Sequence, residues 1–481
     1  MAKERLKTLL LLSMVFISIF LTKRLWITMP YDILSSLKKE EVIGANYLLG
    51  DMIKPHKYLI NFSNEAHTIR YTDNDNYLWT SARSILIDVL SSNSAKLSTI
   101  SDEDFLAFNE KRSIVFYFPE KFNTYIISRS LNITKPNNIV EEIPEIDNIY
   151  FYLGKEEPFL IFSQGKKHVK VYNLNIDIEN IKETVKVIEE NKNFTYYYPM
   201  KDTLGINNNL FISYKMAKDM PEVYVESELN TNNIDEMRNI AEKFFNKNID
   251  YIREIVEDSG SVIYLYNQQV LKINPNGQLE YFNPLEEPVL ERNLYISLNT
   301  AAEFLSQNIG IPQNMYLAKI EEIKSEENLG YRLSFRYRMG EFPLILGSDT
   351  IEDFIQIDVF NKNIRKYKRF IRNDMKLIEN NTENGENILS AFDIINMNMN
   401  YKLLESRYIE KNNLDLKSVE VSSLKEDVLS SIKSLNIAYV DLCIKDKGEK
   451  LIGAWVLEFE DKLYAFDIYN GNLVLEKDIN Q

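Results

Sequence analysis

Residues 269–282 have the sequence QVLKINPNGQLEYF, two short alternating runs of apolar and polar side chains around an Asn-Gly pair. Asn276 and Gly277 favour the two-residue turn of a β-hairpin, because both residue types tolerate a positive φ. A period of two places the apolar side chains of each strand on one face. The stretch therefore predicts a hairpin with one buried face.

This hairpin closes a unit that recurs along the chain. The unit begins with the segment Ile234–Asn246, whose apolar residues recur with the period of a helix. Strands follow from Tyr251 onward and lead into the hairpin. A second copy has a Thr300-x-x-Glu303 capping box opening its helix, and a third ends in strands around the Asn470-Gly471 turn. A helix across one face of an antiparallel sheet is an α+β layer arrangement, which is the fold class we expect.

The region before the repeat has the same mixed character. We expect a helix at Tyr77–Leu90 and a second helix capped by the side chain of Ser101. Short apolar runs, with Thr124–Ser128 among them, predict an antiparallel meander. The helix Glu179–Glu190 and the aromatic strand Phe194–Tyr198 would complete this region.

The chain has 481 residues, which at about 150 residues per domain predicts several domains. We expect an N-terminal tail and anchor followed by three α+β domains. The expected boundaries are 1–30 for the tail and anchor, 31–205 for the N-terminal domain, 206–378 for the central domain and 379–481 for the C-terminal domain.

The first thirty residues carry a membrane signal. Lys3, Arg5 and Lys7 precede an uncharged run from residue 8 to 22, which Lys23 and Arg24 close. As a helix this run would be about 22 Å long, against about 30 Å of hydrocarbon, and the flanking lysine and arginine side chains can extend the usable span. No small-residue cleavage site follows, so we expect an uncleaved single-pass anchor. The short basic tail predicts a cytoplasmic N-terminus and an extracytoplasmic body.

Composition argues against a nucleic-acid partner. The formal net charge is -15, and the basic residues are scattered, so a phosphate backbone would be repelled. Cys443 is the only cysteine, which excludes an intramolecular disulfide within the chain. It lies in an apolar alternating run, where we interpret it as an inert strand residue; a reactive thiol is the alternative.

The motifs of catalysis are not found in the sequence. His56, His67 and His168 are the only histidines, with no HExxH pattern, and neither a P-loop, GxGxxG nor GxSxG is present. We therefore expect no metal, no cofactor and no enzymatic activity. A Ser-His-acid triad built from distant positions stays open, because such triads converge in space.

Three arginines on one strand form a candidate anion-binding surface. Arg332, Arg336 and Arg338 alternate with apolar residues, so they would share an outward face able to meet an anionic polymer or headgroup. The alternative is a solvated strand face paired with Glu321 and Glu322.

The layout resembles the YycH (WalH) family of extracytoplasmic regulators from Gram-positive bacteria. The resemblance covers nearly the whole chain. It rests on Glu4-Arg5-Leu6-Lys7-Thr8 before a short span ending Leu21-Thr22, on Ile85–Leu90, on Tyr331–Phe342 running into Phe354–Tyr367, on Gly453-Ala454-Trp455 through Tyr464-Ala465-Phe466, and on Tyr469-Asn470-Gly471-Asn472.

The resemblance implies a single-pass regulator, without enzymatic activity, of the YycG (WalK) sensor histidine kinase, which controls cell-wall metabolism. It further implies three outer domains, the later two similar to the partner protein YycI, and a transmembrane helix that touches the kinase helices in the lipid bilayer. The expected contact residues are Leu9, Ser13, Ser18 and Leu21. The serines could instead be merely tolerated in a lipid-facing helix.

Two other function classes stay open. One is a membrane-anchored cell-envelope enzyme or enzyme inhibitor, which would need a pocket with converging acids or a histidine base. The other is an envelope module that binds an anionic polymer through the three arginines. Whether a kinase regulator of this kind activates or inhibits does not follow from the sequence.

Overall fold

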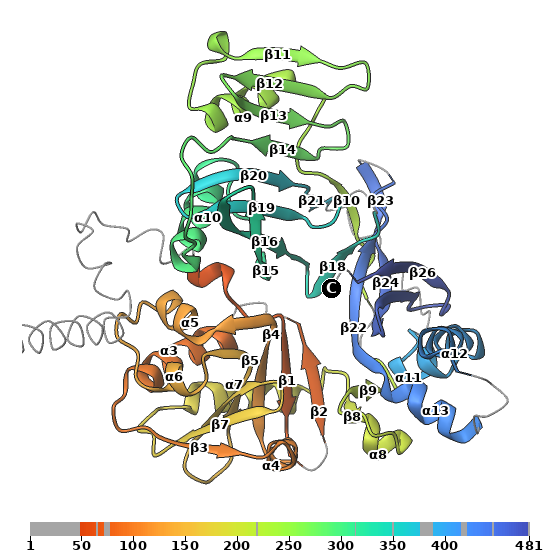
Figure 1. Cartoon of the computed structure of the whole chain (residues 1–481). Helices are drawn as coiled ribbons and strands as arrows, with labels where there is room; N and C mark the ends of the chain where they lie inside the picture. Colours follow the sequence, from red (N-terminus) through yellow and green to blue (C-terminus); the bar gives the residue numbers. More distant parts are fainter. Residues whose placement is uncertain are drawn as a thin grey trace, which may run out of the picture. The chain divides into compact units, whose positions relative to one another are not determined.

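A nine-stranded antiparallel sheet forms the N-terminal part of the fold in the computed structural model (Figure 1). Its strand order is β3 (Lys96–Ile100), β7 (Lys167–Tyr172), β6 (Leu160–Gln164), β5 (Glu145–Tyr152), β4 (Ser113–Asn123), β1 (Lys57–Asn61), β2 (His67–Arg70), β8 (Tyr197–Pro199) and β9 (Phe211–Ser213). Strand β2 pairs with β8 at only one position, His67 opposite Tyr197.

The structure describes residues 49–63, 66–71, 77–217, 220–312, 314–348, 351–375, 388–414, 421–444 and 447–479. All of them belong to one unit, Asn46–Gln481. The predicted anchor and tail lie outside the described residues.

Helices cover both faces of the N-terminal sheet. One face packs on α3 (Tyr77–Ser91), α5 (Thr124–Ser130), α6 (Ile139–Glu142) and α7 (Glu179–Asn191), and the other face packs on α4 (Asp102–Phe108). The predicted Ser101 cap is confirmed, because its Oγ accepts a hydrogen bond from the Asp104 amide at 3.1 Å. The short helix α8 (Met200–Leu204) follows β8.

The predicted strand Thr124–Ser128 is wrong. These residues form helix α5, whose N-cap Asn123 accepts a hydrogen bond from the Ile126 amide at 3.2 Å. The alternation is too short to distinguish the two states, and the cap favours the helix.

The central sheet has eight antiparallel strands. Its order is β11 (Arg253–Val256), β12 (Val262–Tyr266), β13 (Gln269–Ile273), β14 (Leu279–Phe282), β20 (Asn363–Arg369), β19 (Ile355–Phe360), β16 (Asn328–Arg336) and β15 (Tyr316–Ser325). The predicted hairpin at residues 269–282 is confirmed as β13 and β14, with Gly277 at φ 83°. Its turn is longer than the two residues expected, because the Asn274 amide donates to the Gln278 carbonyl and leaves Pro275 in the turn with Asn276 and Gly277. The first two copies of the repeat are joined through β14 and β20 into this one sheet.

Helices α9 (Ile234–Phe245) and α10 (Leu294–Gln307) lie on one face of this sheet. Phe244 of α9 and Phe304 of α10 have ring centroids 5.7 Å apart, and both rings contact Tyr367 of β20. The short 3₁₀ helix Ile249–Tyr251 leads into β11. The capping box predicted to open the second helix is wrong, because α10 begins at Leu294 with Asn293 as its cap, so that Thr300 and Glu303 lie inside it.

The C-terminal sheet has six strands. Its order is β17 (Arg338–Met339), β18 (Phe342–Leu346), β22 (Ile432–Asp441), β24 (Ile452–Phe459), β25 (Lys462–Asp467) and β26 (Leu473–Asp478), with β18 and β22 parallel. Helices α11 (Ala391–Asn396), α12 (Asn398–Asn412) and α13 (Val421–Ser430) accompany it. The Asn470-Gly471 turn between β25 and β26 is confirmed, with Gly471 at φ 73°.

A three-stranded sheet links segments distant in sequence. Strand β10 (Tyr224–Ser227) lies between β21 (Arg372–Asp374) and β23 (Lys447–Lys450), antiparallel to both. The α+β class with mainly antiparallel sheets is therefore confirmed. The expected domain boundaries stay predictions.

Candidate functional site

The predicted contact residues of the anchor, Leu9, Ser13, Ser18 and Leu21, lie outside the described residues. Within the ranges that the structure does describe, none of the helices combines the length and the apolar character needed to cross a bilayer. The anchor, its orientation and its contacts stay predictions from the sequence.

The structure separates the three arginines predicted to share one face. Arg332 is in β16 and forms a two-point ion pair with Asp358, with Nε–Oδ1 at 2.7 Å and Nη2–Oδ2 at 2.9 Å. Arg336 ends β16 and its side chain is 55% exposed. Arg338 belongs to β17 in the C-terminal sheet and is buried. A single exposed arginine face does not form, because the strand ends between Arg336 and Arg338.

The alternative pairing of these arginines with two glutamates is not found among the ion pairs of the described residues. Glu321 stands opposite Arg332 in the strand register, while Asp358 takes the ion pair. Glu322 pairs instead with Arg292.

Arg338 of the C-terminal sheet contacts both the segment before β1 and the central sheet. Its Nη2 donates to the carbonyl oxygen of Pro55 at 2.8 Å, and its guanidinium lies 4.5 Å from the ring centroid of Tyr316. Burial holds the pKa of the neighbouring His56 well below its usual value, and the positive charges of Lys57 and Arg338 lower it further. This junction therefore concentrates positive charge, and the histidine stays neutral near pH 7.

Lys57 brings the N-terminal sheet against the C-terminal sheet. Its Nζ donates to Asn436 Oδ1 of β22 at 3.2 Å and lies 5.2 Å from the ring centroid of Tyr117. Burial lowers the pKa of Lys57 to about 8, although the Glu458 carboxylate opposes the shift. The first residues of β1 are thus a point where all three large sheets come close.

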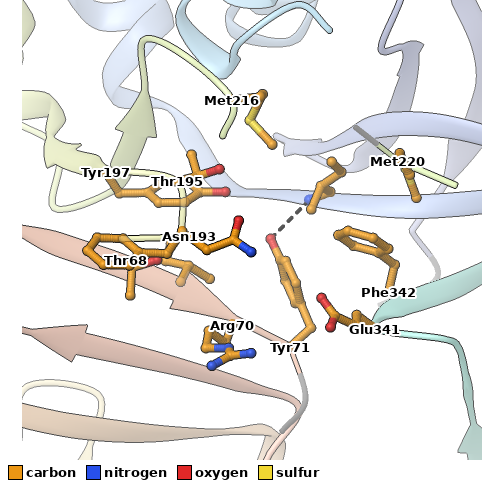
Figure 2. A pocket seen from close by; sticks show the side chains of 13 residues that line it. Thr68, Arg70, Tyr71, Asn193, Thr195, Tyr197, Met216, Met220, Glu341 and Phe342 are labelled. Carbon is orange, nitrogen blue, oxygen red and sulfur yellow. Dashed lines mark hydrogen bonds between the residues drawn. The ribbon is translucent and has the colours of Figure 1, made fainter. Parts of the chain in front are cut away.

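A small hollow opens at the same junction (Figure 2). Its walls come from β2, the segment 193–197, β18 and β22. The lining residues are Thr68, Ile69, Arg70, Tyr71, Asn193, Phe194, Thr195, Tyr197, Met216, Met220, Glu341, Phe342 and Ile437. Apolar and flexible side chains dominate, so the hollow suits an apolar group better than a polar reaction centre.

Tyr71 stands in the middle of this hollow, with Asn193 on one side and Phe342 on the other (Figure 2). Its hydroxyl oxygen accepts a hydrogen bond from the Ile437 amide at 3.0 Å. Burial raises the pKa of Tyr71 far above the usual value, so it stays neutral. The hydrogen bond joins the end of β2 to the middle of β22.

A buried charge cluster joins the central and C-terminal segments. Arg372 donates from Nε to Asp441 Oδ2 at 2.9 Å and from Nη2 to Glu449 Oε2 at 3.1 Å. Arg372 and Asp441 have side chains only 1% and 0% exposed. The Tyr337 hydroxyl also binds the Arg372 backbone through two hydrogen bonds: it accepts one from the Arg372 amide and donates one to the Arg372 carbonyl oxygen. Sequence reasoning missed this cluster, although a lone Asp441 inside an apolar run was a visible signal.

A second buried pair lies next to it. Arg369 forms a two-point ion pair with Glu228, with Nη2–Oε1 at 2.6 Å and Nε–Oε2 at 2.7 Å. Its Nη1 donates to the carbonyl of Gly310 at 2.8 Å. Charged hydrogen bonds of this geometry fix the position of β20 relative to the segment after β10.

A serine, a histidine and an aspartate do converge in the N-terminal sheet. His168 lies 2.8 Å from Ser163 Oγ through Nδ1 and 3.1 Å from Asp102 Oδ1 through Nε2. Ser163 is fully buried, and the ring of Phe105 stacks on His168 at 4.1 Å. A substrate has no access to that hydroxyl, so the group is best explained as a packed polar network rather than a nucleophilic triad.

Cys443 lies just beyond the strand in which it was expected. Strand β22 ends at Asp441, and Cys443 adopts a left-handed φ of 59° with its Sγ 3.4 Å from the Asp441 carbonyl oxygen. Burial and the Asp441 carboxylate raise the pKa of the thiol, which disfavours the reactive thiolate. The described part of the chain holds no group of three or more His, Cys, Asp or Glu side chains placed to bind a metal.

Comparisons with known proteins do not assign this chain to a family. No family model matches the chain, and no curated protein matches it. Among solved structures, the Bacillus megaterium YpeB C-terminal domain aligns with a TM-score of 0.24 and 13% identity, over 52% of this chain and 98% of that domain. A likeness at that score carries no argument.

Proposed function

We propose that the chain is a membrane-anchored accessory regulator of a sensor histidine kinase of the YycG (WalK) type. In this proposal it acts together with a YycI-like membrane protein, with its N-terminus in the cytoplasm and its folded part outside, in the control of cell-wall metabolism. The sequence resemblance to the YycH family supports it. On the structural side it is supported by polar contacts that join the C-terminal sheet to the N-terminal part and to the three-stranded sheet.

These links make the folded part suited to transmit force rather than to perform chemistry. Arg338 binds Pro55 and Lys57 binds Asn436, which ties the C-terminal sheet to the N-terminal part, while Arg372 binds Asp441 and ties the three-stranded sheet to the C-terminal sheet. Buried polar contacts of this kind specify one arrangement, because a displaced charge would lose its partner in a low-dielectric interior. A partner that binds one sheet would therefore act on a body held in a single arrangement.

Regulation would then be a population shift. Moving a two-state kinase from about 1:99 to about 99:1 needs roughly 5.5 kcal/mol of difference in binding free energy between its two states. A transmembrane contact at Ser13 and Ser18, together with an outer contact, would supply it in two parts. No cofactor or chemical step is required.

The test is photocrosslinking of the full chain in its native membrane. Photoreactive side chains at Ser13 and Ser18 are compared with Leu12 and Ile19, which on an ideal helix at about 100° per residue lie about 100° to 120° away from either serine. Cross-linking of a histidine kinase or a YycI-like protein at the serine positions, and lipid at the control positions, is the expected result. Equal capture at all four positions would contradict a defined contact face, and lipid alone at the serines would remove the helix contact from the proposal.

A further inference from the structure

Among the described residues, no helix covers one face of the four strands β11–β14. Helix α9 covers the other face, and Figure 1 shows no further element over the uncovered side of these strands. The uncovered side chains occupy two cross-strand rows. The first row is Arg253, Leu265, Val270, Phe282 and Lys366, and the second is Ile255, Ile263, Lys272, Glu280 and Lys368.

The centre of this face is apolar and lies outside the protein core. We call Ile255, Ile263, Leu265, Val270 and Phe282 the open patch. All five are half-buried, and none of them belongs to a core cluster of the described residues. Their strand neighbours Tyr264, Leu271 and Tyr281 point to the opposite side and are buried there. The patch therefore presents contiguous apolar surface that the described fold does not use, which marks an interaction site.

The rim of the open patch is positive. Lys272 is neutralised by Glu257 at 2.9 Å, and Lys368 stands directly opposite Glu280 in the register. Arg253 and Lys366, at the two ends of the first row, have no ion pair with any described residue, and both are exposed. Asp358, which stands opposite Lys366, is held instead by Arg332. In a chain of net charge -15, uncompensated cations at both ends of an apolar row favour an acidic occupant.

The covered side of the same strands indicates what kind of element fits. Helix α9 packs Met237, Ala241 and Phe244 on the sheet and places Asp235 and Glu236 in its first turn. Its Arg238 forms a two-point ion pair with Glu254, an edge carboxylate on that side. A second amphipathic helix on the uncovered side would complete a helix-sheet-helix sandwich. Where α9 offers Arg238 to a glutamate of the sheet, this second helix would offer carboxylates to Arg253 and Lys366.

We infer that the open patch binds an amphipathic helix of a partner protein, whose apolar strip is flanked by carboxylates that meet Arg253 and Lys366. A bilayer fits less well, because the five apolar side chains are half-buried and do not protrude as membrane-surface elements require. The inference does not depend on the anchor or on the identity of the kinase, since every residue it uses is in the central sheet.

The first arm of the test is photocrosslinking from the full chain in its native membrane. A photoreactive side chain at Val270 is compared with one at Val187 of α7, which is 45% exposed and apolar but lies in the N-terminal region. The expected product at Val270 is a protein segment with helical apolar period and excess Asp and Glu, absent at Val187. Lipid adducts alone, a segment with excess Lys and Arg, or no specific product would each overturn the inference.

The second arm tests the charge match. In the double variant Arg253→Glu, Lys366→Glu, the yield of cross-linking from Val270 should fall about tenfold or more, because the new carboxylates then face the carboxylates of the partner helix. The control is Lys324→Glu on β15, which should leave the yield unchanged. Both reversed positions are exposed, so the variants are expected to keep the thermal unfolding midpoint of the parent. An unchanged yield in a folded double variant would overturn the charge match and with it the proposed occupant.

Discussion

Arg372 and Asp441 face each other at 2.9 Å from Nε to Oδ2, although they are 69 residues apart and almost entirely out of solvent. Asp441 ends β22 of the C-terminal sheet, while Arg372 begins β21 of the three-stranded sheet. Since Glu449 also binds this guanidinium, one cation is shared by two carboxylates. The contact therefore joins the three-stranded sheet to the C-terminal sheet.

Asp441→Asn is expected to destabilise the protein by about 3 kcal/mol, because it removes a fully buried carboxylate from the buried Arg372 guanidinium. The measurement is urea unfolding of wild type and variant at pH 7. The matched control is Asp461→Asn, which removes the partner of Arg407 from a pair whose side chains are 20% and 34% exposed. That change should destabilise the protein clearly less, because water screens an exposed ion pair, and equal losses in both variants would contradict the role assigned to burial.

His67 should make the fold sensitive to mild acid. Burial lowers the pKa of His67 to about 4, and its Nδ1 lies 2.7 Å from Asn61 Oδ1. In the unfolded chain the pKa of His67 is near 6.5, so as the pH falls the unfolded state binds the proton before the folded state does. The contribution of His67 to stability is therefore lost between about pH 6.5 and pH 4. From pH 7 to pH 5 the loss is about 2 kcal/mol.

The measurement is the free energy of unfolding at pH 7 and pH 5 for wild type and His67→Gln. The wild type should lose about 2 kcal/mol more than the variant over this interval. Parallel losses would show that His67 is protonated equally in both states. His56, whose pKa is also held low, contributes to both proteins alike and cancels in the comparison.

Local sequence signals predicted the turns and several helix ends. Gly277 and Gly471 both have a positive φ at the expected hairpins, and Ser101 caps its helix, because these features depend on a few neighbouring residues. Asn123 and Asn293 are equally good caps that sequence reasoning passed over, which misplaced the elements that follow them.

Contacts between distant strands could not be predicted from local pattern. The pairing of β14 with β20 merges two repeat copies, and the alternation of Leu279 and Tyr281 gives no sign of which strand will lie alongside. Arg332 and Arg338 have the same local pattern, yet Asp358 binds one while the other is buried over Tyr316. Such outcomes depend on where other strands arrive, which a single sequence does not encode locally.

Tyr71→Phe is expected to weaken the joint between the N-terminal and C-terminal sheets without opening a cavity. The change removes the acceptor for the Ile437 amide, at a cost of about 1 to 2 kcal/mol for a buried group left unpaired. Hydrogen exchange should then be faster at Ile437, with little change at Trp455 in the neighbouring strand. Unaltered exchange at Ile437 would show that the amide has another acceptor.

Lys57 should make the fold more stable as the pH rises. Burial lowers its pKa from 10.5 to about 8, so the folded protein releases this proton before the unfolded chain does. Between about pH 8 and pH 10.5 the unfolded chain binds more protons, and the stability contribution of Lys57 therefore increases with pH. Over the interval from pH 7 to pH 9 the gain is about 1.4 kcal/mol.

The measurement compares wild type with Lys57→Met by urea unfolding at pH 7 and pH 9. The variant should lack the gain, while Cys443 and the tyrosines cancel because both proteins contain them. The control is Lys450→Met, since the Glu222 carboxylate raises the pKa of Lys450 and both of its states stay protonated across this range. If Lys57→Met and wild type respond to pH alike, the lysine is solvated, and its contact with Asn436 does not bury it against the C-terminal sheet.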